Sequence, residues 1–198
     1  MDYRTESGIN AATRVIAGDE GTQYDSVAIA LHWSTAILVV LQMALAQLWG
    51  LWGRPAHHVM VIAHMSFGIV LAAIIVARLV WRWIPGHQVP ALEVGWVRIA
   101  SKTVHYLLYA MLVAEAVLGF LLRWSGGESM SFFGLQIAPP FAQWSRPAHR
   151  QVGELHEWNG WAIIALATGH AAAALYHHYV LHDRVLERML PGSAASDR

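Results

Sequence analysis

The sequence contains no cysteine, which excludes several kinds of redox centre at once. Without thiols the chain forms no disulfide, offers no thiolate to a metal ion or an iron–sulfur cluster, and lacks the C-x-x-C-H attachment site of a c-type haem. Any redox group must therefore be held by other side chains. Histidine is the abundant candidate, with 12 copies among 198 residues.

Charged residues are also scarce. Asp, Glu, Lys and Arg make up 13% of the chain, whereas hydrophobic residues make up 56%. This composition is too apolar for an ordinary soluble domain of this length and predicts a membrane protein. Basic and acidic residues balance at 13 each, so the chain lacks the basic excess that nucleic-acid binding requires.

Four apolar segments follow a polar amino-terminal stretch. They cover residues 26–52, 57–84, 97–124 and 153–181. Each is longer than the roughly 20 residues that cross about 30 Å of hydrocarbon as a helix. The sequence therefore predicts an all-α membrane protein, a four-helix transmembrane bundle over residues 26–190. Residues 1–25 are expected to form a polar cytoplasmic tail and residues 191–198 a short carboxy-terminal tail.

The links between the segments differ in length. GRPAH, between the first two, predicts a tight turn and hence antiparallel neighbours. PGHQVPALEVG, between the second and third, is also short and rich in helix breakers. Residues 125–152 form a longer link with an apolar patch that is expected to lie along the membrane surface.

Basic residues are distributed unevenly between the two predicted sides of the membrane. Nine of the 13 fall on the side that carries both termini, and the other side holds Arg54, Arg123, Arg146 and Arg150. Because cytoplasmic loops carry the excess of Lys and Arg, both termini are expected in the cytoplasm.

The spacing of the histidines predicts two binding sites at different depths. His156 and His170 are 14 residues apart, close to four helical turns, so both project from nearly one face and are separated by roughly 21 Å along the axis. With alternating helix directions, His32 lies at the depth of His170, on the cytoplasmic side. His64 lies at the depth of His156, on the outer side. Two cross-helix pairs are therefore predicted.

Two such pairs, with no thiolate or carboxylate trio nearby, suit bis-imidazole ligation of two b-type haems. Zinc usually requires four ligands at one point. A small residue follows each candidate by one turn and would leave room for a flat macrocycle: Ala36, Gly68, Gly160 and Ala174. His105 lacks this feature, since Tyr109 follows it. Two other hypotheses stay open, namely a cofactor-free structural or assembly subunit and a histidine-lined metal carrier.

Three further polar residues lie within the predicted helices. Arg78 follows His64 by 14 residues and is expected at the inner level, either pairing with haem propionates or serving as a flanking positive charge. His177, seven residues beyond His170, would bond a quinone carbonyl, relay a proton or lie at the interface. Glu115 would be protonated, bond a histidine across the bundle, relay protons or simply be tolerated near a wet crevice.

Several motifs resemble those of bacterial cytochromes b561. They are LHW at 31–33, AHMSFG at 63–68, ARLVWR at 77–82, HYLLY at 105–109, LHEWNGW at 155–161 and GHAAAALYHHY at 169–179. The resemblance, from about Tyr24 to Pro191, implies an inner-membrane cytochrome that exchanges electrons with the quinone pool through two b haems, with the four paired histidines as axial ligands. Some relatives resemble superoxide oxidases, which pass electrons from periplasmic superoxide to ubiquinone, and on that model His177 matches a residue near the quinone.

The resemblance leaves the physiological partner open. Related b-type cytochromes also anchor hydrogenases and dehydrogenases in the membrane, and the long amino-terminal tail would suit a cytoplasmic partner. Ala116 stands where relatives often carry a helix-kinking proline. The preferred hypothesis is an electron-transfer oxidoreductase that links quinone to a periplasmic partner, either superoxide or a protein. A basic outer surface would steer such an anion or dock an acidic protein, and it comprises Arg54, His57, His58, Arg146, His149 and Arg150.

Overall fold

The computed structural model describes residues 24–85 and 95–191. The predicted tails therefore lie almost entirely outside the described residues, as does most of the PGHQVPALEVG link. Four long helices form the body of the protein: α2 (Ser26–Leu48), α3 (Arg54–Trp83), α4 (Gly95–Ser125) and α5 (Arg146–Tyr179). A hairpin of β1 (Met130–Phe132) and β2 (Leu135–Ile137) lies between α4 and α5, and a short 3₁₀ turn, η1 (Glu187–Met189), follows α5.

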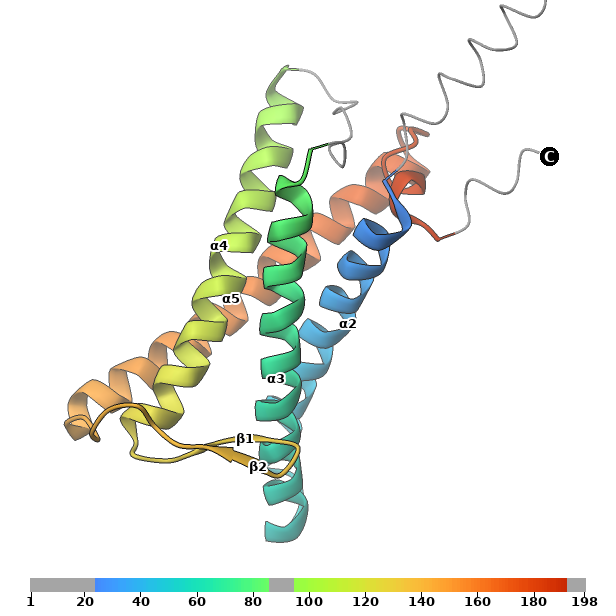
Figure 1. Cartoon of the computed structure of the whole chain (residues 1–198). Helices are drawn as coiled ribbons and strands as arrows, with labels where there is room; N and C mark the ends of the chain where they lie inside the picture. Colours follow the sequence, from blue (N-terminus) through green and yellow to red (C-terminus); the bar gives the residue numbers. More distant parts are fainter. Residues whose placement is uncertain (1–23, 86–94, 192–198) are drawn as a thin grey trace, which may run out of the picture.

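Two helices, α3 and α5, begin at least three residues earlier than predicted, and proline explains both differences. GRPAH was predicted to be a turn, but α3 already begins at Arg54 and carries Pro55 in its first turn. Likewise, α5 begins at Arg146 rather than at residue 153, with Pro147 in its first turn. The first N–H groups of a helix have no intrahelical partner, so proline loses nothing at this position. Residues 49–53 alone connect α2 to α3, which are antiparallel neighbours as predicted (Figure 1).

The start of α2 is tied to the end of α3 by one side chain. Asp25 caps α2 by accepting a hydrogen bond from the Ala28 N–H at 2.9 Å, which satisfies one of the unpaired donors of the first turn. Both oxygens of the same carboxylate lie 3.1 Å from Trp81 Nε1, near the end of α3. The cap therefore stabilises a helix end and a helix–helix contact together.

Three of the four helices, α2, α3 and α4, are long and apolar enough to cross a membrane. Large hydrophobic side chains on these helices face outward, as expected where lipid replaces water: examples are Ile37, Val40 and Val76. The fourth helix, α5, is equally long but more polar, because its first half carries Arg146, Arg150, Glu154 and Glu157. That α5 also crosses the bilayer stays a prediction.

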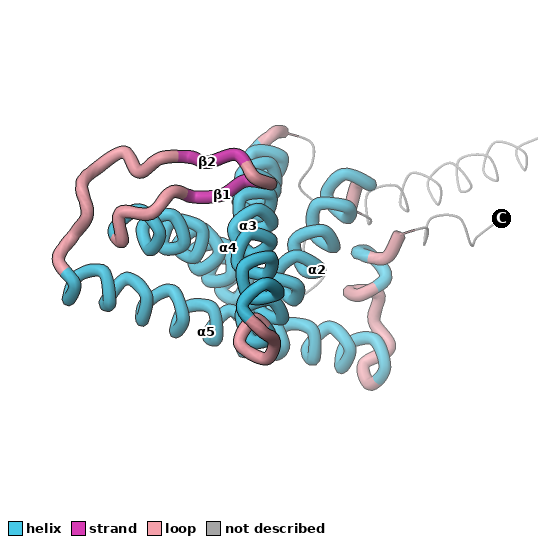
Figure 2. Tube along the Cα trace, turned by 90° about the horizontal axis from the view of Figure 1, so that it is seen from below, coloured by secondary structure: helices cyan, strands magenta, loops and turns pink. Residues whose placement is uncertain are grey.

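The helices pack in a chain of neighbours. α2 runs along α3, α3 along α4 and α4 along α5, while α5 passes diagonally behind α4 and α3 towards the start of α2 (Figure 1). Figure 2, turned by 90°, shows the same helix lying across the others. A small apolar cluster in the middle of the bundle joins three helices through Leu71, Ile75, Leu112 and Ile163. Because α5 meets every level of the bundle, it can supply side chains to both ends.

The first and last described residues lie at the same end of the bundle. The Arg188 guanidinium lies 5.7 Å from the ring centre of Tyr24. Trp33 Nε1 donates a hydrogen bond to the Met189 carbonyl at 2.7 Å. Which side of the membrane this end faces stays a prediction.

The hairpin closes the other end against α3. Phe133 and Gly134 both have positive φ, the combination that a two-residue type I′ turn requires. The Phe133 N–H donates to Ser66 Oγ of α3 at 2.9 Å, and the Phe133 ring packs edge-on against Phe67. The hairpin thus holds part of the apolar patch of the long link at the protein surface, where Phe133 and Leu135 are exposed.

Candidate cofactor-binding sites

The inner pair consists of one histidine from the start of α2 and one from the second half of α5. The ring centres of His32 and His170 lie 6.4 Å apart, and the rings are nearly perpendicular. Both side chains are partly buried. They lie towards the end of the bundle where the first and last described residues meet.

The outer pair joins α3 to the first half of α5. The ring centres of His64 and His156 lie 6.3 Å apart, with an angle of 85° between the ring planes. The structure therefore brings together the two combinations that the depth argument predicted. The role of these histidines as ligands stays a prediction.

The spacing within each pair fits two imidazoles that share one metal ion. A metal–nitrogen bond of about 2 Å on each side, with about 1.2 Å from nitrogen to ring centre, separates the two ring centres by roughly 6.4 Å. The two observed distances, 6.4 and 6.3 Å, match this value. Within residues 24–85 and 95–191, no three His, Cys, Asp or Glu side chains are placed to hold one metal ion between them. Two facing imidazoles at this spacing would suit an iron whose other ligands come from a macrocycle.

Arg78 lies beside the inner pair, at the level that its spacing from His64 predicted. Its Nη2 donates to His32 Nδ1 at 2.8 Å, and its guanidinium lies 5.1 Å from the ring centre of Tyr109. A guanidinium only donates hydrogen bonds, so Nδ1 of His32 is the acceptor in this arrangement. Arg78 thus touches a candidate ligand directly.

A third histidine at the inner site was not selected from the sequence. The ring centre of His105, on α4, lies 5.0 Å from that of His170, and its Nδ1 donates to the Ser101 carbonyl at 2.7 Å. The criterion of a small residue one turn later rejected His105 because Tyr109 follows it. Its place in the HYLLY motif was the available signal. The hydrogen bond to the backbone turns the His105 ring towards the pair without needing a cofactor.

Gln42 braces the outer pair from α2. Its backbone carbonyl accepts from His64 Nδ1 at 3.2 Å, and its Nε2 donates to the His64 carbonyl at 2.9 Å. A Cβ added to Gly68 would lie only 2.8 Å from Gln42 Nε2. The small residue after His64, expected to leave room for a macrocycle, therefore makes room for this amide.

Glu115, whose role the sequence left open, lies against the other member of the outer pair. Its Oε1 is 3.2 Å from His156 Nδ1, and its Oε2 accepts from Asn159 Nδ2 at 2.7 Å. A Cβ added to Gly160 would lie 3.1 Å from Glu115 Oε1. Here too the space beside the glycine holds a polar side chain. Clearance for a macrocycle stays a prediction.

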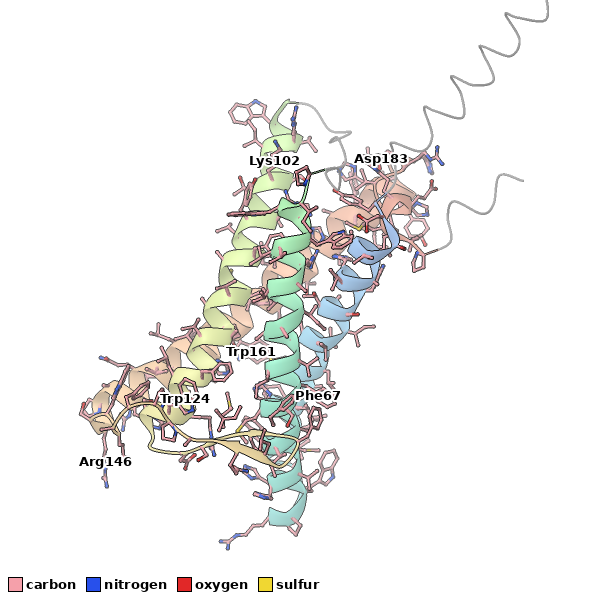
Figure 3. All side chains as sticks on the ribbon, viewed as in Figure 1. Phe67, Lys102, Trp124, Arg146, Trp161 and Asp183 are labelled. Carbon is pink, nitrogen blue, oxygen red and sulfur yellow. The ribbon has the colours of Figure 1, made fainter. Side chains whose placement is uncertain are left out.

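His177 lies at the end of α5 and pairs with a residue that the sequence did not single out. Its Nδ1 is 2.5 Å from Asp183 Oδ2, and the Val185 N–H donates to Oδ1 of the same carboxylate at 3.1 Å. Desolvation acts to raise the pKa of Asp183, but these two hydrogen bonds, together with the charges of His177 and His178, hold that pKa below its usual range. Asp183 therefore stays ionised at neutral pH and orients His177, at the end of the bundle where α2 begins (Figure 3).

The predicted basic outer residues lie at the opposite end from Asp183. Arg54 begins α3 and Arg146 begins α5, and Figure 3 shows Arg146 at the lower left, at the end of the molecule opposite Asp183. Two of the histidines in this group have local partners: His149 Nδ1 lies 2.9 Å from Ser125 Oγ, and the His57 ring packs against Trp49. The exposed arginines of this group are therefore more available than these two histidines to attract an anion.

Known proteins resemble this chain over nearly its whole length. A family model described as prokaryotic cytochrome b561 matches residues 23–192. Cytochrome b561 homolog 2 of Escherichia coli strain K12 is 32% identical over 183 residues, which are 88% of this chain and 94% of that protein. Cytochrome b561 homolog 1 of the same strain is 31% identical over 175 residues, 85% of this chain and 97% of that protein. A probable superoxide oxidase CybB of Yersinia pestis is 28% identical over 177 residues, 85% of this chain and 96% of that protein.

Proposed function

The chain belongs to the prokaryotic cytochrome b561 family of multi-pass bacterial membrane proteins, and we propose that it carries electrons through two stacked b-type haems between quinone and a partner outside the cytoplasm. Membership implies membrane electron transfer and b-type haem. Our proposal adds to this the number of haems, the quinone as one redox partner and a second partner outside the cytoplasm.

One observation carries the proposal: two histidine pairs at different depths, each with a ring separation of 6.3–6.4 Å. His32 and His170 would hold the inner haem. His64 and His156 would hold the outer one. A haem held by two histidines would supply a one-electron iron centre without an open ligand position, which suits electron transfer rather than chemistry at the metal.

Arg78 would serve the inner site as a binding group for propionate. An imidazole that ligates iron through Nε2 keeps its proton on Nδ1, and that nitrogen can no longer accept from a guanidinium. Arg78 would then turn from His32 to another acceptor. A propionate carboxylate is the natural one, because a guanidinium binds carboxylates through paired charge-assisted hydrogen bonds.

His177 would serve quinone at the cytoplasmic end. Reduction of a quinone to the quinol takes up two electrons and two protons. An imidazole held by an ionised carboxylate can donate a proton and be recharged from solvent, and the His177–Asp183 pair has this arrangement.

Superoxide is the outer electron donor that the exposed arginines favour. Two superoxide anions would each give up one electron and leave as dioxygen, which balances the two electrons that the quinone takes up. Arg146 and Arg150, on the first turns of α5, would steer the anion. A relative at 28% identity carries the name probable superoxide oxidase, which agrees with this choice.

We expect the purified protein to contain two b-type haems per chain. A reduced-minus-oxidised absorption spectrum and a haem-to-protein ratio measure this directly. Absence of a b-haem band would refute the proposal and favour a cofactor-free subunit, whereas bound zinc or copper without haem would point to a metal carrier. Isolation from native membranes tests the remaining alternative, a membrane anchor of a larger dehydrogenase, hydrogenase or respiratory complex, because such subunits would come with the chain.

Replacement of Asp183 by asparagine should slow proton delivery to quinone. Without the carboxylate, His177 loses the acceptor that orients its ring, so reoxidation of the pre-reduced protein by a soluble ubiquinone should slow by about tenfold, less than the 10²–10⁴ typical of losing the proton donor itself. Stopped-flow absorbance of the haem bands measures the rate.

Glu187→Gln is the matched control for this variant. It removes the same charge from the same end of the bundle, where Glu187 pairs with Arg184 rather than with a histidine. Because the low pKa of Asp183 keeps its carboxylate ionised at neutral pH, the effect of D183N should persist from about pH 6 to 8. Equal rates of reoxidation by ubiquinone in D183N and E187Q would show that His177 and Asp183 do not deliver protons to the quinone.

A further inference from the structure

We propose that Glu115 on α4 is a positioning residue for the outer haem: it accepts the Nδ1 proton of His156 and thereby lowers the redox potential of that site. The inference rests on the proposed function, because a redox potential exists only if His156 ligates a haem. It goes beyond that function by assigning a task to a carboxylate that no ligand role explains.

The carboxylate and the imidazole face each other across the α4–α5 contact. Glu115 Oε1 lies 3.2 Å from His156 Nδ1, and both side chains are only about one-fifth exposed, at 22% and 21%. In the part of the chain that the structure describes, Nδ1 of His156 makes no well-aligned hydrogen bond, and its neighbour is Glu115, through both the carboxylate and the backbone. A small rotation of either side chain would complete the bond with Oε1. In that bond the carboxylate oxygen accepts, so Nδ1 would carry the proton and Nε2 would be left for a metal.

A second side chain of α5 holds the carboxylate in place. Asn159 Nδ2 donates to Glu115 Oε2 at 2.7 Å and to the Met111 carbonyl of α4 at 3.0 Å. Asn159 follows His156 by three residues, so the two lie on the same face of the helix. Each carboxylate oxygen thus has its own neighbour on α5, which determines the orientation of Glu115.

Two glycines let the helices approach closely enough for this contact. A Cβ added to Gly160 would lie 3.1 Å from Glu115 Oε1, tighter than ordinary van der Waals contact. A Cβ added to Gly119, one turn after Glu115, would lie 3.5 Å from His156 Cε1. Gly160 is therefore the position at which a single methyl group would displace the carboxylate.

The Nδ1 environment of His156 differs from that of two other proposed ligands. Nδ1 of His64 meets the neutral backbone carbonyl of Gln42, and Nδ1 of His32 meets the guanidinium of Arg78. A carboxylate behind an axial imidazole makes the imidazole a stronger electron donor and favours ferric iron. The outer site should thus have its potential lowered by Glu115, which favours onward transfer of an electron to the inner site.

Redox titration of the haem-loaded, full-length protein tests this assignment. Glu115→Gln keeps the shape of the side chain and its bond to Asn159 but removes the charged acceptor. We expect both haems to remain bound, and one of the two midpoint potentials to rise by about 59 mV, a tenfold change in the reduction equilibrium of a one-electron couple. Glu115→Asp, which keeps a carboxylate, should shift that potential less.

Glu157→Gln is the matched control for charge alone. Glu157 is exposed and adjacent to His156 in sequence, so its replacement removes a negative charge at the same depth without altering the Glu115 contact. We expect both potentials to stay at their wild-type values. An equal shift in the Glu157 and Glu115 variants, or two unshifted potentials in E115Q, would overturn the proposal.

Gly160→Ala gives an independent test with Glu115 intact. The added methyl group should push the carboxylate away from His156 and raise the same potential that E115Q raises. If E115Q fails to bind the outer haem, G160A decides: an unshifted potential there overturns the proposal. Absence of haem in the wild-type spectrum would instead refute the proposed function itself, and this inference with it.

Discussion

Replacement of His64 or His156 by alanine should remove one of two haems per chain and leave the inner one. A b-type haem has no covalent link to the protein, so its axial bonds contribute a large part of its binding free energy. The ring centres of His64 and His156 are 6.3 Å apart, a distance that one metal ion can bridge. His156 is separated from His170 of the inner pair by roughly 21 Å along α5. Haem content, measured as a haem-to-protein ratio and by the loss of one component in a redox titration, should fall by about half.

The inner variants should give the complementary result. His32→Ala and His170→Ala should each remove the other redox component, and a variant that combines one replacement from each pair should contain no haem. His58→Ala is the control, because this exposed histidine lies near the start of α3, at the same end of the bundle as the outer pair. Retention of both haems in a single-histidine variant of either pair would disprove the pairing.

Neutralising Arg146 and Arg150 together should slow superoxide-driven quinone reduction by about tenfold at low ionic strength. Both guanidinium groups are exposed on the first turns of α5, at the end of the bundle opposite Asp183. Charged surfaces of this kind raise the association rates of small anions by 10–10³-fold. The R146Q/R150Q variant should therefore lose rate without losing haem.

Ionic strength separates steering from structural damage in this experiment. The Debye length falls from about 10 Å at 0.1 M to 3 Å at 1 M salt, so the rates of variant and wild type should converge as salt is added. Arg98→Gln with Lys102→Gln is the matched control, since it removes two exposed charges from the far end of α4 (Figure 3). A wild-type rate that is constant across ionic strength would contradict steering.

The histidine spacing was predictable because a membrane helix has few degrees of freedom. A rise of 1.5 Å and a turn of 100° per residue convert the 14-residue interval between His156 and His170 into two depths on one face. Because lipid requires each span to be a continuous helix, the depth of a histidine on a neighbouring helix also follows from its position in the sequence, and one such histidine matches each depth. The same constraint made the long helices visible as apolar segments, although the polar first half of α5 obscured where that helix begins.

The residues around the histidines were not predictable in the same way. Asn159 and Glu115 meet only because α4 and α5 approach through Gly119 and Gly160, and a crossing distance depends on side chains from both helices. His105 is close to His170 for a comparable reason, through the rotation of α4 about its axis. Neither the crossing distance of α4 and α5 nor the rotation of α4 about its axis follows from the periodicity of one segment.

The class of protein and the selection of four histidines follow from the amino-acid sequence, since hydropathy and helical spacing are properties of single segments. The partner of each Nδ1 atom follows only from the packed helices: an arginine at His32, a backbone carbonyl at His64 and a carboxylate at His156. These contacts depend on how each helix is rotated and how closely it approaches its neighbour. Such rotations and distances are set by the packing of all four helices together.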